Sequence, residues 1–331
     1  TLPNVSKVGY SAKWIDQTAP SGTAITTASQ LAGISSSGTY YLANDIDLSG
    51  YSSWTPISSF SGTLDGRGFA IKNLKITSGS AKVGLFAQIS GATIKNIVLE
   101  NVNINFSYST SSASFCGALV GAISSGTSNI INCRVTGSLT TSYTVSDYNF
   151  YTGGICGKIL EGGVLNISNS VNEASIKGTT SSTSYFAFGG GIVARTDGNA
   201  TITNCVNKGA ITVNCGSGNS SIAGGIVAQM GVESSTITVN IKNCYNQGGL
   251  EINSDTSYSS RGGILGRNYK SNVTISNCFN AGSVGNQIYT RYETNAPTLN
   301  NCYYLSGTSG TAQGTAVSTV SDLASKFYNN M

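Results

Sequence analysis

Carboxylates are the side chains of this 331-residue sequence that could most directly carry out chemistry, and the chain has only 14 of them. Glu161, Asp197 and Glu233 stand out because they recur every 36 residues, each a few positions after a glycine-rich segment. Glycoside hydrolases use a pair of carboxyl groups, one of which protonates the leaving group. If the chain repeats with that period, neighbouring acids lie about 5 Å apart and form a weak catalytic candidate. The same pattern is typical of solvated turn residues, which the sequence favours.

Asp45 and Asp47 are the second place where acids come close in sequence. Residues two apart in a β-strand share one face, so these carboxylates are a weak candidate for holding a cation, although turn hydrogen bonds explain them more simply. Histidine is absent from the whole chain, which excludes Ser-His-Asp and Cys-His catalysis, His-ligated zinc and the HExxH helix of metalloproteases. The sequence therefore predicts no cofactor and no resident metal, and it favours a role without catalysis.

Aromatic residues gather in six segments, which we call the aromatic loops: 107–116, 142–152, 180–189, 214–223, 253–261 and 286–296. The chain has 17 Tyr and 10 Phe, and 12 of these residues lie in the aromatic loops. Exposed rings stack on sugar faces and act as hot spots for protein partners, and arginine supplies planar donors for anionic groups. The sequence therefore predicts that a glycan or a host surface protein binds along one edge, at Tyr108, Tyr143, Tyr148, Tyr151, Tyr185, Phe188, Tyr258, Arg261, Tyr289, Arg291 and Tyr292. The alternative is that these rings pack the loops against the wall of the fold.

A repeating architecture must bring these loops to one edge. A Gly-apolar segment returns at spacings of 33, 36, 37, 34 and 38 residues, beginning at Gly84, Gly117, Gly153, Gly190, Gly224 and Gly262. Each period holds three short runs rich in Ile, Val and Thr, separated by Gly, Asn and Ser, with Pro nearly absent. Helical repeats of similar length need helix formers at 3.6-residue spacing, which these runs lack. One period is therefore predicted to form one three-stranded coil of a parallel β-solenoid, an all-β fold of about eight coils.

A second motif inside the period has the form Ile-x-Asn-Cys-x-Asn-x-Gly-x-Ile, and its clearest copy spans residues 202–211. Ser170 replaces the cysteine in one coil, and the related copies centre on Cys133, Cys244, Cys278 and Cys302. Stacked coils would align the asparagines into amide ladders and the cysteines into an inward column. Because the side chains of such a column point the same way, the sequence favours free buried thiols over disulfides and offers zinc no tetrahedral site.

The two ends of the chain differ from the repeating middle. Thr27 and Gln30 have capping-box spacing, which predicts a short helix, and residues 319–327 are a candidate closing helix. Helices at the ends would cover open sheet edges and block edge-to-edge association. We therefore expect an N-terminal segment with a capping helix over 1–36, a parallel β-helix over 37–317 and a C-terminal capping helix over 318–331. Neither a signal peptide nor an initiator Met is evident, which indicates a processed or excised piece.

Charge and hydropathy exclude several classes of partner. Only 10% of the residues are charged, the net charge is +4, and the basic residues form no run. This pattern argues against nucleic-acid binding. No stretch reaches the roughly 18 apolar residues of a membrane helix, so the chain is not expected to be membrane-embedded.

The sequence resembles the GLUG-repeat β-helices of large bacterial surface proteins over roughly residues 25–330. The resemblance lies in Gly38–Leu48 (GTYYLANDIDL), in Phe60–Phe69 (FSGTLDGRGF) and in the repeats GICG at 154–157 and GILG at 263–266. The copies beginning at Gly84, Gly191 and Gly225 end in Ala rather than Gly, a mild departure for a structural repeat. The resemblance implies a single right-handed parallel β-helix, a secreted or cell-surface location and further domains in a larger polypeptide.

GLUG-type repeats occur in adhesins and beside the catalytic domains of IgA-cleaving metalloproteases. The HExxH motif of those catalytic domains is absent here, so the protease activity is not carried over. The resemblance and the aromatic loops together predict a non-catalytic bacterial surface protein used in adhesion. The alternatives are a polysaccharide-degrading β-helix enzyme, either hydrolase or lyase, and a structural stalk of a larger surface protein.

Overall fold

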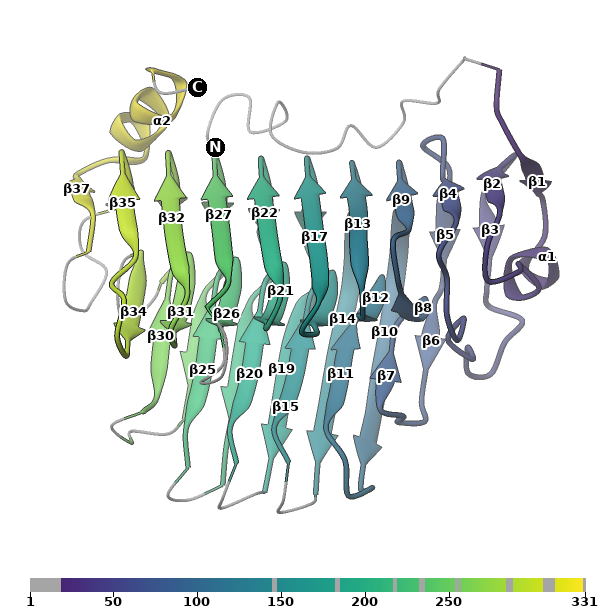
Figure 1. The fold of residues 1–331 in the computed structure, drawn as a ribbon, viewed down its shortest axis with the longest axis horizontal. Coiled ribbons are helices and arrows are strands. Elements are labelled where there is room, and N and C mark those ends of the chain that lie inside the picture. The colour runs from purple at the N-terminus through teal and green to yellow at the C-terminus, as the bar shows by residue number, and fades with distance from the viewer. Residues whose placement is uncertain are drawn as a thin grey trace.

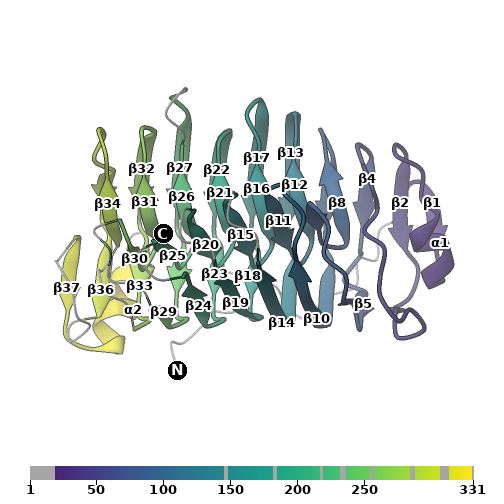
Figure 2. The same cartoon turned by 90° about the horizontal axis from the view of Figure 1, so that it is seen from below.

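The chain folds into a parallel β-solenoid, seen here in a computed structural model that describes residues 19–144, 148–181, 185–216, 219–231, 236–253, 256, 258–283, 288–305 and 313–329. The coils stack in sequence order from the purple to the yellow end of Figure 1, and the view from below in Figure 2 shows the same order. The predicted all-β parallel solenoid is confirmed.

Four parallel sheets run along the solenoid, and we call them A, B, C and D. Sheet A contains β1 (Thr23–Ile25), β2 (Thr39–Leu42), β4 (Thr63–Asp65), β9 (Thr93–Lys95), β13 (Gly126–Ile131), β17 (Gly163–Ser168), β22 (Asn199–Thr203), β27 (Thr238–Lys242), β32 (Asn272–Ser276) and β35 (Thr298–Asn300). Sheet B contains β3 (Ile46–Asp47), β5 (Ala70–Lys72), β6 (Lys75–Ile76), β10 (Val98–Tyr108), β14 (Arg134–Tyr143), β18 (Val171–Asn172), β19 (Ser175–Thr180), β23 (Val206–Asn207), β24 (Ile211–Asn214), β28 (Tyr245–Asn246), β29 (Leu250–Ile252), β33 (Phe279–Asn280), β36 (Tyr303–Leu305) and β37 (Thr315–Val317).

The other two sheets are shorter. Sheet C contains β8 (Phe86–Ile89), β12 (Val120–Ile123), β16 (Cys156–Ile159), β21 (Val193–Thr196), β26 (Val227–Met230), β31 (Leu265–Asn268) and β34 (Tyr289–Tyr292). Sheet D contains β7 (Lys82–Val83), β11 (Ser114–Gly117), β15 (Phe150–Gly153), β20 (Ala187–Gly190), β25 (Ser221–Gly224) and β30 (Ser260–Gly262). Among the described residues six coils include a strand of sheet D, fewer than the predicted number of about eight, and sheet A has ten strands because β1, β2, β4 and β35 extend it at the ends.

A full coil visits the sheets in the order D, C, A and B, so the prediction of three strands per coil is wrong. The Gly-apolar segment, which looks like one run in the sequence, bends sharply and supplies the end of a D strand and the start of a C strand. A Cβ added at Gly153 would lie 1.9 Å from the carbonyl oxygen of Cys156, and one at Gly190 would lie 1.9 Å from that of Val193. Only glycine leaves room for the backbone to turn this corner.

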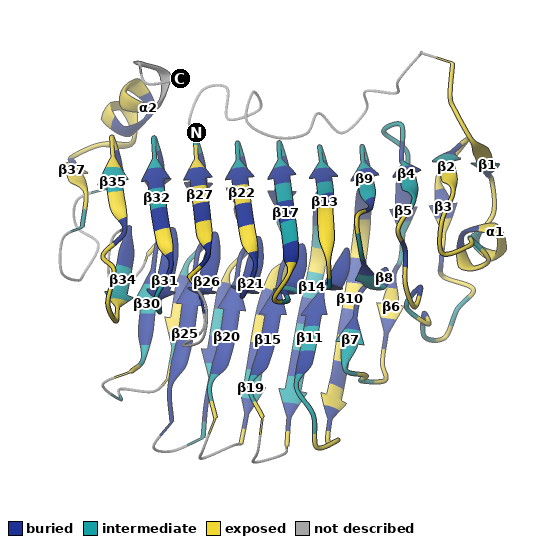
Figure 3. Ribbon diagram, in the orientation of Figure 1, coloured by how far each residue is buried: buried dark blue, intermediate teal, exposed yellow. Residues whose placement is uncertain are grey.

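The interior is a stack of aliphatic residues in register. One column of sheet A is formed by isoleucines that are at most 1% exposed, namely Ile94, Ile130, Ile167, Ile202, Ile241 and Ile275. Neighbours in such a column are about 4.8 Å apart, the spacing of hydrogen-bonded strands. Along the strands of sheet A buried and exposed residues alternate, as the blue and yellow bands of Figure 3 show.

The cysteines lie inside the solenoid, as predicted, and all eight are free and buried. Ser170 takes the place of a cysteine in the column, and its hydroxyl oxygen accepts a hydrogen bond from the backbone N–H of Cys133 at 3.1 Å. Burial raises the pKa of the Cys133 thiol to about 12, so the thiol is protonated at neutral pH. These thiols therefore act as small apolar core groups.

Two asparagine ladders run parallel to the cysteine column. The outer ladder stands at the turn between sheets A and B in the left-handed conformation, with φ between 50° and 55°, at Asn96, Asn132, Asn169, Asn204, Asn243, Asn277 and Asn301. The inner ladder lies in sheet B and is fully buried, at Asn172, Asn207, Asn246 and Asn280. Both confirm that the repeated asparagines stack from coil to coil.

The ends carry the two helices of the described chain. Helix α1 (Ala28–Ala32) begins with the predicted capping box between Thr27 and Gln30. Helix α2 (Val320–Asn329) begins after Thr319, whose hydroxyl oxygen accepts a hydrogen bond from the backbone N–H of Asp322 at 3.0 Å. Strand pairing in sheet A starts at β1, ahead of α1, and the division into 1–36, 37–317 and 318–331 stays a prediction. In the part of the chain that is described, neither helix has the length and apolarity to cross a membrane.

Candidate functional site

The residues predicted to bind a ligand separate into a buried and an exposed group. Five of them are at most 6% exposed, so the prediction that they belong to an accessible surface is wrong for Tyr108, Tyr143, Tyr151, Phe188 and Tyr289. The rings of Tyr108 and Tyr143 stack at 5.4 Å inside the solenoid, and Tyr143 also stacks on Phe150 at 5.8 Å. These rings occupy the inward positions of alternating strands, where apolar burial outweighs exposure to a ligand.

Tyr151 and Phe188 are buried on the opposite, outward face of sheet D, apart from the main core. Register aligns Phe115, Tyr151 and Phe188 on this face, and the rings of Tyr151 and Phe188 stack at 4.9 Å. Lys158 of β16 lies 4.9 Å from the Tyr151 ring centroid, and Arg195 of β21 lies 5.7 Å from that of Phe188. We call this set the cation–aromatic corner. Cations of sheet C cover the rings of sheet D where the two outward faces meet.

Asp197 joins the cations of the corner. Its carboxylate oxygens lie 2.8 Å from Lys158 Nζ and 2.7 Å from Arg195 Nε, and the residue is 6% exposed. Arg195 also donates to the Tyr151 hydroxyl at 3.2 Å. Burial lowers the pKa of Arg195, but the neighbouring Tyr151 and Asp197 raise it by more, so the guanidinium stays charged. Asp197 is thus an ion-pair partner inside a packed corner.

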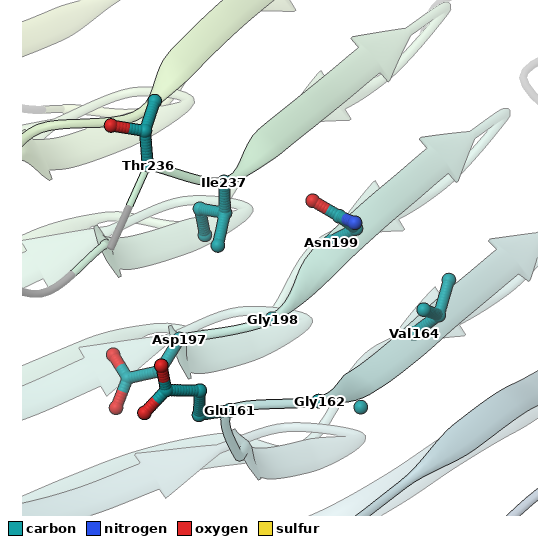
Figure 4. A pocket seen from close by; sticks show the side chains of 9 residues that line it. Glu161, Gly162, Val164, Asp197, Gly198, Asn199, Thr236 and Ile237 are labelled. Carbon is teal, nitrogen blue, oxygen red and sulfur yellow. The ribbon is translucent and has the colours of Figure 1, made fainter. Parts of the chain in front are cut away.

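The acids predicted as a catalytic cluster are placed in part. Glu161 and Asp197 line an open pocket of about 160 Å³, and their carboxylates point to the same side of the chain in Figure 4. Glu233 lies outside the described residues. Both Asp197 oxygens are paired with cationic nitrogens, and a catalytic role of Glu161 and Asp197 stays a prediction. No group of three or more Cys, Asp or Glu residues is arranged for a metal in the described parts of the chain.

Asp45 and Asp47, predicted as a weak cation site, are occupied by protein donors. Asp45 accepts from the backbone N–H of Ala70 at 2.9 Å and pairs with Lys72 at 2.6 Å. Asp47 accepts from the backbone N–H of Ser49 and the side chain of Asn73, each at 2.9 Å. Burial raises the pKa of Asp45, but Ala70 and Lys72 lower it by more, and the bonds from Asn73 and Ser49 lower the pKa of Asp47. Both carboxylates act as turn acceptors.

The exposed group of predicted ligand residues consists of tyrosines, which we call the tyrosine edge: Tyr148, Tyr185, Tyr258 and Tyr292, between 38% and 47% exposed. The rings of Tyr148 and Tyr185, one coil apart, are stacked with centroids at 6.4 Å. Arg291 is half-buried, and its guanidinium lies 4.6 Å from the Tyr258 ring centroid. Arg261 is half-buried in β30, in register with Ala223.

Lys158, Arg195 and Arg267 were not among the residues predicted from the sequence. Each stands five positions after the first glycine of its Gly-apolar segment, and Gln229 occupies the same offset. Register aligns these four residues on the outward face of sheet C. A long polar side chain at a fixed offset within an apolar run was the available signal. It marks the positions where the solenoid wall faces away from the core.

Comparisons with known proteins agree with this fold. Residues 33–137 match the model of the M26 IgA1-specific metallo-endopeptidase N-terminal region. Halomucin of Haloquadratum walsbyi (strain DSM 16790 / HBSQ001) is 36% identical over 132 residues, which cover 37% of this chain and 1% of that protein. A candidate immunoglobulin A1 protease from Bacteroides ovatus has a similar structure with a TM-score of 0.59 and 18% identity, covering 93% of this chain and 88% of that one. A structure of an IgA1 protease has a TM-score of 0.54 and 20% identity, covering 89% of this chain and 22% of that one.

These likenesses relate the chain to IgA1-protease architecture at the level of the solenoid. The family match covers less than half of the chain, and the structural identities are low enough that they show the fold alone. The chain spans about a hundredth of the curated relative and about a fifth of the second structure. The predicted association with IgA proteases is therefore supported, whereas the assignment to GLUG repeats stays a prediction.

Proposed function

We propose that this chain is a non-catalytic binding module of a larger secreted or cell-surface polypeptide, and that it holds its partner at the tyrosine edge. One observation carries the proposal. Among the described residues, five large apolar side chains are exposed, and all except Val320 are tyrosines of the predicted aromatic loops. A spacer has no use for such a concentration of exposed rings, whereas tyrosine is enriched in the few residues that dominate binding energy at interfaces.

The packing behind the edge supports a binding role. The cation–aromatic corner and the inner rings fix the coils from which the tyrosines project, so their positions are set before a partner arrives. Phe186, for instance, packs edge-on against Phe188 at 6.1 Å and lies 6.4 Å from the ring of Tyr258. Aromatic residues held in this way lose little conformational entropy on binding.

The relatives indicate where to look for a partner. An adhesin-like surface would bind a glycan or a host protein, and immunoglobulin A1 is part of the names of the matched family and of two structural relatives. Immunoglobulin A1 is therefore the first protein probe, and host mucin and plant polysaccharide fragments are the first glycan probes. The proposal includes a secreted or cell-surface location, which is compatible with these relatives.

The experiment compares the wild-type chain with a variant in which Tyr148, Tyr185 and Tyr258 are replaced by alanine. Binding to immobilised immunoglobulin A1 and to a glycan array is measured by surface plasmon resonance and fluorescence. Loss of hot-spot side chains is expected to weaken binding by at least about 30-fold, with the thermal midpoint unchanged.

The matched control is Tyr41→Ala. Tyr41 is a half-buried ring of sheet A whose face is covered by Arg67 at 5.8 Å, and it lies outside the aromatic loops. Wild-type binding that the triple variant retains would disprove the role of the tyrosine edge. A wild-type chain that binds neither class of probe would favour the stalk alternative.

A further inference from the structure

We infer that the chain has a second ligand site, a pocket for one neutral sugar residue of a glycan, where strands of sheet C turn into sheet A. Residues of three successive coils line this pocket (Figure 4). Tyr148, Tyr185 and Tyr258 of the tyrosine edge precede strands of sheet D, whereas the pocket lies after strands of sheet C. The two sites are therefore distinct, and a ligand can bind at one without the other.

The pocket arises because successive turns between the two sheets differ in length. The strand bounds leave turn residues 160–162, 197–198 and 231–237, which are three, two and seven residues long. Since the strands of sheet A stay in register, the shortest turn, in the middle, is recessed between its two neighbours. Coils of equal length would stack their turns flush and leave no hollow.

The hollow has a bare floor and apolar lining. A Cβ added at Gly198 would lie 2.0 Å from the carbonyl oxygen of Gly163, so the backbones of two turns touch there without a side chain between them. Val164 and Ile237 supply the apolar lining. The pocket volume of about 160 Å³ is close to the roughly 150 Å³ of an engineered cavity that holds a benzene molecule. One six-membered ring therefore fits, and the open mouth lets a longer glycan continue into solvent.

Two polar side chains of the lining offer complementary hydrogen bonds. Asn199 Oδ1 accepts from the backbone N–H of Thr238 at 2.9 Å, which fixes the amide and leaves its NH2 group to donate. Glu161 is exposed, and its carboxylate oxygens accept. A sugar hydroxyl both donates and accepts, so it can use an acceptor and a donor that line one pocket. Sites for small molecules combine an apolar lining with a few oriented polar groups in this way.

The charges beside the pocket favour a neutral ligand. The carboxylate oxygens of Asp197 pair with Lys158 Nζ at 2.8 Å and Arg195 Nε at 2.7 Å, so both are already occupied. With Glu161 these are two acids and two bases, and the formal charges of the four described groups sum to zero. Calcium needs six to eight oxygen ligands and would be repelled by the two bases, whereas an acidic sugar would be repelled by Glu161. A neutral sugar residue meets neither penalty.

The test removes the acceptor and fills the pocket in separate variants. Glu161→Ala deletes the carboxylate, whereas Val164→Phe keeps the polar groups and places a ring in the hollow. The probes are an array of neutral and acidic glycans, followed by isothermal titration calorimetry with each bound glycan and with calcium chloride. Loss of a hydrogen bond to a charged group should weaken neutral-glycan binding by Glu161→Ala at least about tenfold, and Val164→Phe should weaken it by at least as much.

Glu251→Ala is the matched control, since it removes an exposed carboxylate from β29 in sheet B. It should leave glycan affinity unchanged, and so should the variant in which Tyr148, Tyr185 and Tyr258 are replaced by alanine. Thermal midpoints check that each variant is folded. Glu161 lies in an exposed turn, so Glu161→Ala decides the matter where Val164→Phe lowers the midpoint.

Neutral-glycan binding that Glu161→Ala weakens and the tyrosine variant retains supports the inference. Glycan binding that the tyrosine variant loses, while Glu161→Ala and Val164→Phe retain it, would overturn the inference and support the proposed function. Binding of acidic glycans alone, or of calcium that Glu161→Ala abolishes, would overturn it by showing another class of ligand. A wild-type chain that binds no glycan would also overturn it, and the immunoglobulin A1 probe would still decide the proposed function.

Discussion

The inner and outer asparagine ladders place the same side chain in two environments, where it has two different structural roles. In the outer ladder amides donate to the asparagine of the preceding coil, for example Asn243 to Asn204 at 3.1 Å, and all its members except the exposed Asn301 are half-buried. In the inner ladder Asn172, Asn207 and Asn246 donate to the asparagine of the following coil, Asn207 to Asn246 at 2.9 Å, and also to the backbone carbonyl two residues later in the chain. The outer ladder sets a turn, whereas the inner one satisfies polar groups within the core.

The difference shows in what surrounds each ladder. A Cβ added at Gly191 would lie 2.4 Å from the Cγ of Asn207, and one at Gly225 would lie 2.4 Å from that of Asn246. In each Gly-Gly corner the second glycine, such as Gly191, leaves room for the inner asparagine. The first glycine, such as Gly190, leaves room for the backbone to bend. The coil before Asn172 has no inner asparagine, because Val135 occupies the position in register with Asn172. In that same coil the second glycine of the corner is also replaced, and Ala118 follows Gly117.

The largest effect expected from this comparison is at the glycine that faces the inner ladder. Gly191→Ala would place a methyl group 2.0 Å from the carbonyl oxygen of Gly225 as well as against Asn207. Because neither backbone nor a hydrogen-bonded buried amide can move aside cheaply, we expect a loss of about 3 kcal/mol or more in the free energy of unfolding. Chemical denaturation followed by circular dichroism measures it.

Gly249→Ala is the matched control, since nothing lies within 4 Å of the added Cβ. That substitution should change stability by less than about 1 kcal/mol. Equal stability losses in the two variants would mean that the glycines are needed for chain flexibility and not for room beside the ladder.

The second effect comes from the ladder itself. Asn207→Ala removes an acceptor of Asn172 and the donor to Asn246 and to the Gly209 carbonyl, so three hydrogen bonds of the buried ladder are lost. We expect a loss of about 2–3 kcal/mol. The double variant Gly154→Ala with Asn172→Val, which copies the preceding coil, should lose less stability than the sum of its single variants. Strict additivity would contradict the coupling between corner glycine and inner asparagine.

Much of this arrangement was predictable because it repeats. The Asn-Cys-x-Asn motif predicted the ladders and the inward cysteine column, and Thr27 with Gln30 predicted helix α1. The sequence predicted three strands per coil and not four, because the D and C strands meet within one Gly-apolar segment. The glycine corner between them breaks neither the apolar pattern nor the repeat spacing. The types of the residues in that segment do not reveal that the backbone bends between the two strands.

The tyrosine edge was predictable only in part, for a related physical reason. The aromatic loops were found by composition, but composition does not say toward which face a ring turns. Tyr148 and Tyr151 are three residues apart in the sequence, yet one is exposed and the other is covered by Lys158 and Arg195. The cations that cover it come from the next sheet of the same and the following coil. Whether these cations reach the Tyr151 ring depends on the angle between sheets D and C, which residue types do not reveal.

A smaller effect is expected in the outer ladder. Asn204 has a φ of 53°, which asparagine tolerates far better than alanine, so Asn204→Ala should cost about 1–2 kcal/mol. Asn204→Gly loses the ladder bonds to Asn169 and Asn243 but relieves the backbone, and should cost less than about 1 kcal/mol. Thermal denaturation of the two variants orders them. An alanine variant more stable than the glycine variant would show that the left-handed backbone conformation does not set this turn.

The smallest effect concerns the charged residue beside the inner ladder. Burial raises the pKa of Glu173, but hydrogen bonds from Lys208 at 2.7 Å and from Arg134 lower it by more. A carboxyl group whose pKa falls on folding stabilises the protein above its unfolded pKa, about 4.3, and the contribution disappears as the pH falls through the folded value. We expect Glu173→Gln to cost under about 1 kcal/mol at pH 7, and progressively less as the pH falls below the unfolded pKa and through the lowered folded pKa. Thermal midpoints of both proteins across that range measure the gap, and a gap of constant size would mean that Glu173 acts by packing. Asn207→Ala, which removes no titratable group, should keep its stability loss across that range, so the pH dependence separates the ionic contact from the amide ladder one residue away.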